Sequence, residues 1–278
     1  MKIYPKYTSF HYGADYQQRQ LKKFLDRRKN DWRFEIDLII RLTDKYARER
    51  LKRHRESITL VDFGCSIGTY AIEFAKKGYR SIGIDFDDDG IRMAKELSKK
   101  EGVKPRFLKR DITDLGDEIP EIDVAVFSNI FEHLHDDELG AVLEALKKKI
   151  SPEGFIVYIT KPTAYYYIFF GKKIFRWPLY AFRWLPEKKF TCLVKIYHYI
   201  LDIGFLLKNG QTRRESAKRI GHCNPTTLER LSDIFARAGF KNLFIKTDEL
   251  YPMVPGMKNR FSKYSISHPF LYGVVAPD

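Results

Sequence analysis

Cysteine is scarce in this chain, and the few cysteines it has are not spaced for a metal site. The three are Cys65, Cys192 and Cys223, an odd number far apart in the sequence, so we expect neither a disulfide framework nor a bound metal. We therefore expect a reducing, cytoplasmic location. Residues 1–5, MKIYP, begin no apolar leader, and no uncharged run reaches the ~18–20 residues of a bilayer span.

Acidic residues are also in deficit, but only in parts of the chain. The net charge is +14; residues 1–56 carry +8 and residues 161–221 carry +10, whereas residues 57–160 carry −6. A basic surface attracts phosphates, nucleic acid or an anionic membrane. The alternative is an ordinary solvated surface rich in lysine.

The common nucleotide-binding patterns are missing as well. Residues 60–63 form a short apolar run typical of a buried strand, and the turn after it holds Gly64 and Gly68. This spacing does not match G-x-G-x-x-G, and no lysine stands where a phosphate-binding loop needs it. Helical spacing resumes at Thr69, so the stretch predicts a strand, a tight glycine turn and a helix N-terminus, which together suit a polar ligand.

Three more predicted strands end in polar residues, at a spacing that suits a nucleotide-binding fold. Asp85 follows residues 80–84, Asp111 follows residues 106–110, and Asn129 follows residues 122–128. Helical patterns separate these runs, and alternating strands and helices predict a parallel sheet covered on both faces. The carboxyl ends of parallel strands share one edge, so we expect these residues around one site.

Read together, residues 62–68, DFGCSIG, and the later acids resemble the class I S-adenosylmethionine-dependent methyltransferases, whose first motif is commonly D-x-G-C-G-x-G. Ser66 departs from that pattern, because it stands where the family has its middle glycine. The resemblance covers about residues 57–160 and 222–278. It implies an α/β, Rossmann-like, doubly wound sheet of seven strands with the last strand antiparallel, and S-adenosyl-L-methionine as cofactor.

The resemblance also implies roles for individual residues. The backbone around Gly64–Gly68 holds the amino-acid tail, Asp85 accepts the ribose hydroxyls beside Phe86, Asp111 and Ile112 bind the adenine, and Asn129 lies under the sulfonium. The predicted cofactor-binding residues are Asp62, Gly64, Cys65, Ser66, Gly68, Asp85, Phe86, Asp111, Ile112 and Asn129.

Two segments lie outside the resemblance. Residues 1–56 read as an N-terminal helical extension, in which Tyr12 and Tyr16 are expected to pack, with ligand contact as the alternative. Residues 161–221 form a long insertion after the fifth strand, dense in aromatic and basic residues, which we interpret as a helical cap for the acceptor or for a membrane face. Within it, residues 193–207 are apolar but contain Lys195, His198 and Asp202, which favours an amphipathic or buried helix over a span.

The sequence thus predicts a methyltransferase acting on an oxygen or nitrogen, less readily a carbon, of a small or lipid-linked, partly apolar acceptor. An acceptor of high pKa needs a base, and His133 and His222 are the candidates. Methylation of RNA through the basic flanks is the second reading. The third is a non-catalytic protein that binds the cofactor and acts as a regulator or scaffold, or associates with a membrane through the insertion.

Overall fold

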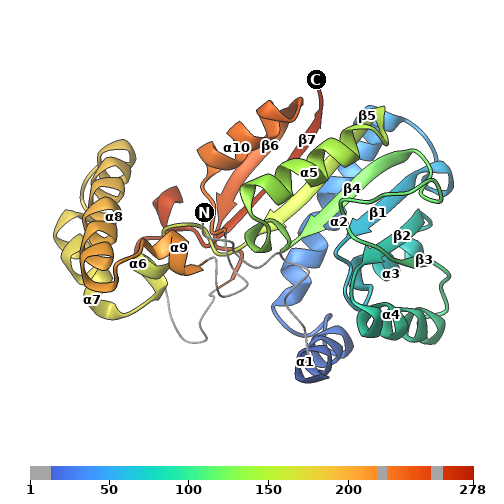
Figure 1. Ribbon diagram of the computed structural model, residues 1–278, viewed down its shortest axis with the longest axis horizontal. Helices are drawn as coiled ribbons and strands as arrows, with labels where there is room; N and C mark the ends of the chain where they lie inside the picture. The colour runs from blue at the N-terminus through green and yellow to red at the C-terminus, as the bar shows by residue number, and fades with distance from the viewer. Residues whose placement is uncertain (1–13, 218–223, 252–258) are drawn as a thin grey trace.

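The computed structural model describes residues 14–217, 224–251 and 259–278. Seven strands form one sheet in the order β3-β2-β1-β4-β5-β7-β6 (Figure 1). Their bounds are β1 Thr59–Phe63, β2 Arg80–Asp85, β3 Arg106–Lys109, β4 Ile122–Ser128, β5 Ile150–Thr160, β6 Phe240–Asp248 and β7 Phe270–Pro277. Strands β1 to β5 pair in parallel, and β7 runs antiparallel to both β5 and β6. The predicted sheet, including its antiparallel last strand, is confirmed.

Helices cover both faces of the sheet, as the alternation of strands and helices predicts. Helices α5, Asp136–Lys147, and α10, Leu228–Arg237, pack on one face, and α2, Trp32–Tyr46, and α3, Thr69–Lys76, pack on the other. Strand β4 shows why both faces need a cover. Ala125 and Phe127 point into the first cluster, while Val124 and Val126 point into the second, because successive side chains of a strand face opposite sides.

Two helices complete the N-terminal half of the molecule. Helix α4, Asp88–Lys100, packs beside β2 and β3, and α1, Ala14–Leu25, lies at the carboxyl end of the sheet (Figure 1). Phe24 from the end of α1 is buried with Cys65, Ala94 and Phe107 in a third cluster. The N-terminal extension also contains η2, Ala47–Leu51, and η3, Arg55–Ser57, and η4, Phe131–His133, follows β4.

The insertion after β5 is helical and has a small core of its own. It contains α6 Tyr166–Phe170, α7 Lys173–Arg176, η5 Trp177–Phe182, α8 Glu187–Asn209 and α9 Arg213–Ala217. The segment before β7, with η6, Ser265–Ser267, joins this core: the rings of Phe190 and Tyr264 stack with centroids 3.8 Å apart. Helix α8 is amphipathic, as expected; the alternative of a buried helix is wrong, because its outer face is exposed.

Candidate active site

The turn between β1 and α3 has the left-handed backbone that its glycines predict. Gly64 has φ of 63° and Gly68 has φ of 81°, and Ser66 between them adopts φ of 47°. Left-handed backbone is costly for a residue with a side chain, which explains why the resembled family has glycine at the position of Ser66. The turn is also tightly packed, since a Cβ atom on Gly68 would stand 2.6 Å from the Phe107 ring.

Asp85 at the end of β2 faces this turn. Its Oδ2 accepts a hydrogen bond from the Ser66 N–H at 2.7 Å, and its Oδ1 accepts one from the Asp87 N–H at 2.9 Å. The residue is only 7% exposed. Burial, which disfavours a charged carboxylate, raises the pKa of Asp85 to about 6. Each carboxylate oxygen keeps acceptor capacity for a further donor.

Asp62 and Cys65 support the turn from below. The Asp62 carboxyl is buried and accepts a hydrogen bond from the Ala71 N–H at 3.1 Å, which ties β1 to the first turn of α3. Burial, with the charge of Asp85 adding to it, raises the pKa of Asp62 to about 8. The Cys65 side chain lies in the core cluster with Phe107, so any contact that Cys65 makes with a ligand comes from its backbone.

The end of β3 lies next to the end of β2. The Arg110 N–H donates to the Asp85 carbonyl at 2.8 Å, and the Asp111 Oδ1 accepts from the N–H and hydroxyl of Thr113 at 2.8 and 2.7 Å. Ile112 is buried in the large core cluster, and Phe86 packs against the same cluster. The structure therefore brings the predicted adenine and ribose residues to one edge of the sheet.

Asn129 occupies the same edge at the end of β4. Its backbone is left-handed, with φ of 56°, and its side-chain Nδ2 donates to Glu35 Oε2 at 2.9 Å. Its Oδ1 is buried and accepts no hydrogen bond from any of the described residues. A buried acceptor without a donor is costly in a folded protein, and it suits a site whose ligand supplies the donor or positive charge.

A polar cluster that the sequence analysis did not predict lies beside Asn129. Glu35 from α2 is fully buried, and it accepts hydrogen bonds from the Lys161 ammonium and the Tyr251 hydroxyl. The Lys161 Nζ also donates to the Tyr251 hydroxyl at 3.1 Å. Burial, reinforced by the charge of Glu35, raises the pKa of Tyr251, so the phenol keeps its proton. Two signals existed in the sequence: a carboxylate within an apolar helix face, and a lysine directly after β5.

Helix α1 lies close to Asp85, the residue predicted to bind the ribose hydroxyls. The pKa of Tyr16 is raised chiefly by burial and also by the charges of Asp85 and Asp87, which places its phenol near the end of β2. The Gln17 side chain donates to the Asp87 carboxylate. Of the two tyrosines considered for ligand contact, Tyr16 therefore lies at the site, and Tyr12 is outside the described residues.

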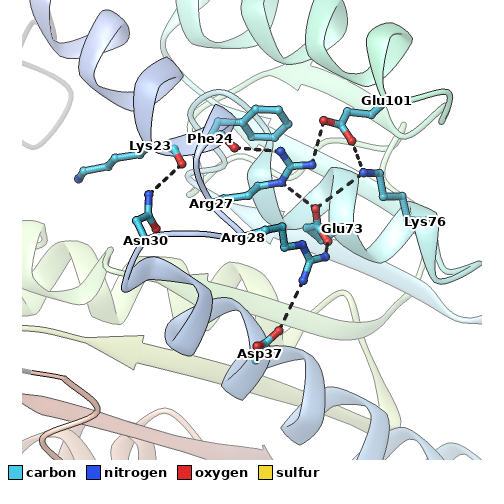
Figure 2. Close-up of polar contacts among 9 residues, drawn as sticks. All are labelled: Lys23, Phe24, Arg27, Arg28, Asn30, Asp37, Glu73, Lys76 and Glu101. Carbon is cyan, nitrogen blue, oxygen red and sulfur yellow. Dashed lines mark hydrogen bonds and ion pairs between the residues drawn. The ribbon is translucent and has the colours of Figure 1, made fainter.

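An ion-pair network attaches the end of α1 to α3 and α4 (Figure 2). Arg27 is buried and donates to Glu73 Oε1 at 2.8 Å and to Glu101 Oε1 at 2.9 Å, and Arg28 pairs with the other oxygen of Glu73. The Arg27 guanidinium also lies over the Phe24 ring, 3.9 Å from its centroid. These contacts hold α1 against the carboxyl edge of the sheet.

Of the two histidines proposed as bases, the structure describes only His133. His133 is half-buried in η4, and its N–H donates to the Ile130 carbonyl at 2.9 Å. Its neighbour Glu132 is buried and accepts a hydrogen bond from the Thr160 hydroxyl at 2.8 Å. His222 lies outside the described residues. A catalytic role for either one stays a prediction.

Comparison with protein families identifies the family of the chain. The model of a methyltransferase domain family matches residues 32–244, more than half of the chain. The chain belongs to this family of methyltransferases. It is thus an enzyme of the class I, S-adenosylmethionine-dependent type, as the first motif and the acids at the strand ends indicate.

Individual relatives are distant. The ubiquinone biosynthesis O-methyltransferase of Rickettsia typhi is 24% identical over 204 residues, which cover 69% of this chain and 80% of the relative. The ribosomal protein L11 methyltransferase of Thermus thermophilus is 35% identical, but over only 24% of this chain and 27% of the relative.

Solved structures share the fold of the methyltransferase at low identity. The magnesium protoporphyrin IX methyltransferase of Synechocystis superposes with a TM-score of 0.53 at 14% identity, covering 95% of this chain and 97% of that one. A plantazolicin methyltransferase gives a TM-score of 0.55 at 16% identity, covering 98% and 93%. At such identities the likeness shows the fold alone.

The residues at the carboxyl edge fit the cofactor of the family. Asp85 offers carboxylate oxygens to hydroxyl donors such as those of a ribose, and the free Asn129 Oδ1 suits a neighbouring positive charge. The N–H groups of Cys65, Ser66, Gly68 and Ala71 are already bonded within the chain, so the carboxylate of the cofactor would be held by other N–H groups of the turn and of the α3 N-terminus. Direct binding by Asp62, Ser66, Asp111 and the other predicted residues stays a prediction.

Proposed function

We propose that this methyltransferase acts on an ionisable hydroxyl of a small or lipid-linked, partly apolar acceptor. The observation that carries this proposal is the Lys161–Glu35–Tyr251 cluster beside Asn129. The cluster places a fixed ammonium group at the carboxyl edge, close to the position expected for the sulfonium. A positive charge there stabilises an acceptor oxygen as its anion.

Lys161 has the right bonding capacity for this role. An ammonium group has three N–H donors, and Glu35 and Tyr251 accept two of them. The Lys161 side chain is 23% exposed, so the third donor is available to a ligand. Partial burial and then the like charge of Lys161 lower the pKa of Lys23 on α1, so a second cation lies in the neighbourhood.

The surroundings of Lys161 are aromatic. Its ammonium lies 5.0 Å from the centroid of the Phe270 ring and 5.6 Å from that of Tyr251. Phe34 stacks on Tyr251 with centroids 6.2 Å apart. Aromatic walls around one cation suit an acceptor with an apolar ring and an acidic hydroxyl.

The names of the relatives support transfer to oxygen. Several ubiquinone biosynthesis O-methyltransferases match this chain at 24–26% identity. The ribosomal protein methyltransferase matches over a much shorter stretch. The predicted cytoplasmic location, with peripheral contact to a membrane, remains part of the proposal.

The reaction is an in-line displacement, for which bound S-adenosylmethionine supplies the activated methyl group. The acceptor oxygen forms a bond to the methyl carbon while the carbon–sulfur bond breaks, and the hydroxyl proton is lost to solvent or to a base. Phenols have a pKa near 10 in water. The Lys161 ammonium lowers that pKa, so little general-base catalysis is needed, and Glu35 and Tyr251 hold the ammonium in place.

The proposal is tested by following labelled methyl groups. The enzyme is incubated with tritium-labelled S-adenosylmethionine and with separate small-molecule, lipid and RNA fractions of a cell extract. We expect label in the small-molecule or lipid fraction, as a methyl ether. Label in RNA would favour the second reading of the sequence, and cofactor binding without label in any fraction would favour the regulatory reading; either result contradicts the proposal.

The role of Lys161 is tested on the labelled fraction. In Lys161→Met the acidic limb of the kcat/KM profile should move upward by about one pH unit or more, because the hydroxyl loses its ammonium neighbour. Lys104→Met, an exposed lysine after α4, is the matched control and should leave the profile unchanged. An unchanged profile in Lys161→Met would remove Lys161 from the acceptor site.

A further inference from the structure

Exposed apolar side chains are concentrated in the insertion. Of twelve large hydrophobic residues exposed among those described, ten lie between Ile174 and Leu207. Trp177 and Trp184 are 75% and 73% exposed. Figure 1 shows α7 and α8 at one end of the molecule, away from the sheet. A monomeric soluble protein rarely leaves so much apolar surface in one place without a partner.

The outer face of α8 carries a regular apolar stripe. Its exposed members are Ile196, Tyr199, Ile200, Ile203, Leu206 and Leu207. The spacing of three and four residues places them along one side of the helix. Phe190 and Val194, on the inner side, are buried in the core of the insertion. Helix α8 is therefore apolar on two sides, and only one side is covered.

Helix α8 is as long as a membrane span, but its ion pairs fix it on the surface of the protein. It has 23 residues, and it is the one helix in the described part of the chain that is long and apolar enough to cross a bilayer; 11% of its apolar stretch is buried. However, Lys195 pairs with Glu229 at 2.9 Å, and Asp202 pairs with His198 and Arg213 at 3.3 and 3.1 Å. Crossing a bilayer would bury these charges and strip the inner face from its core.

Most of the exposed charges of the insertion are positive. Lys172, Lys173, Arg183, Lys188, Lys189 and Lys208 are exposed and pair with no acidic group in the described structure. The insertion has three acids, and each is engaged: Glu187 by Ser265, Asp202 by Arg213, and Glu215 by Thr212. The six unpaired cations therefore outnumber the three acids of the insertion two to one, and its surface carries a net positive charge.

We propose that the face formed by α7, η5, Trp184 and the outer side of α8, here called the insertion face, docks on the surface of an anionic phospholipid bilayer. A helix with aliphatic residues on its free side and lysines beside them lies in the interfacial plane. Tryptophans such as Trp177 and Trp184 favour the headgroup level, and each lysine near an anionic leaflet adds electrostatic attraction.

Two other binding partners, a second copy of the chain and a single-stranded nucleic acid, fit the insertion face less well. In a symmetric dimer the same patch meets itself, which would bring unpaired lysines near the lysines of the partner. Single-stranded nucleic acid binds by stacking on aromatic rings, whereas the α8 stripe has five aliphatic residues and one tyrosine. A bilayer accepts both the aliphatic stripe and the cations.

The test uses the full chain with vesicles of phosphatidylcholine alone or with 30% phosphatidylglycerol. We expect co-sedimentation with the anionic vesicles, weakened by salt, and a blue shift of tryptophan emission, because two of the three tryptophans lie on the insertion face. Lys188→Gln/Lys189→Gln should weaken binding about fivefold per charge removed. Lys99→Gln/Lys100→Gln on α4 removes the same charge elsewhere and should bind as the unaltered chain does.

The apolar part is tested with Ile200→Gln/Ile203→Gln, compared with Leu25→Gln, an exposed leucine of α1. The first variant should lose most vesicle binding and the second should keep it. The inference fails if the chain ignores anionic vesicles, if the α8 variant binds as well as the Leu25 variant, or if sedimentation shows a dimer that Ile200→Gln/Ile203→Gln dissociates. Transfer of labelled methyl to a soluble acceptor is measured in parallel, so failure of docking is distinguishable from failure of the proposed function.

Discussion

Arg27, at the turn after α1, and Glu73, on α3, form a buried ion pair with 2.8 Å between Nε and Oε1, and this pair joins the N-terminal helix to α3 (Figure 2). Both side chains are almost fully enclosed, so each charge depends on the other. The consequence is that α1, which brings Tyr16 and Gln17 towards Asp85 and Asp87, is fixed by electrostatics as well as by Phe24.

The first prediction concerns this pair. Arg27→Met should lower the free energy of unfolding by about 3 kcal/mol, because it leaves the Glu73 carboxylate buried with only part of its compensation. It should also weaken S-adenosylmethionine binding about tenfold, equivalent to ~1.4 kcal/mol, because α1 is loosened. Urea unfolding and calorimetric titration measure the two effects.

The matched control is Arg92→Met on α4, which breaks an exposed pair with Asp89. This substitution should lower the free energy of unfolding by less than about 1 kcal/mol and leave the affinity for S-adenosylmethionine unchanged. Equal losses of stability in Arg27→Met and Arg92→Met would show that the buried network does not hold α1.

The second prediction is a pH dependence of cofactor binding. The pKa of Asp85 is raised to about 6 by burial, and only the ionised carboxylate accepts hydrogen bonds from two hydroxyls. Affinity should therefore fall as the pH drops from 7 through 6, to about tenfold weaker at pH 5. Asp85→Asn should bind weakly at every pH and lose this dependence. Calorimetric titrations with S-adenosylmethionine at a series of pH values from 5 to 8 test this prediction. If the affinity of the unaltered protein did not change with pH, Asp85 would not bind the cofactor.

The third prediction separates two glycines. Gly68→Ala should destabilise the fold by about 1–3 kcal/mol, because φ of 81° disfavours a side chain and the new Cβ would lie 2.6 Å from Phe107 and 2.9 Å from the Ala94 Cβ. Gly140→Ala, inside α5 with nothing near its Cβ, should stabilise by up to about 1 kcal/mol. Thermal unfolding of both variants measures these changes in stability. If Gly68→Ala stabilised the protein, the turn would not require a glycine at this position.

Local patterns in the sequence were sufficient for the sheet and for one half of the site. Short apolar runs, glycines at the turn and polar residues directly after the strands are all short-range signals, and they located Gly64, Asp85, Asp111 and Asn129 at one edge. The departure at Ser66 was visible too, and its left-handed φ of 47° shows what the backbone requires there.

The proposed acceptor half of the site depends on contacts between segments far apart in the chain. Glu35, Lys161 and Tyr251 come from α2, the end of β5 and the segment after β6, and no local pattern indicates that they meet. Likewise, composition showed that residues 161–221 are aromatic and basic, but only the packing of Phe190 against Tyr264 shows which face of α8 stays exposed.

Calorimetric titration of S-adenosylmethionine into the unaltered protein, Asp85→Ala and Asp89→Ala tests the central claim most directly. Asp89 lies four residues after Asp85 but is exposed on α4, so it controls for the loss of one acidic charge. We predict one binding site per chain, lost in Asp85→Ala and unchanged in Asp89→Ala. Equal affinity in all three proteins would contradict a cofactor site at the carboxyl ends of β1, β2 and β4.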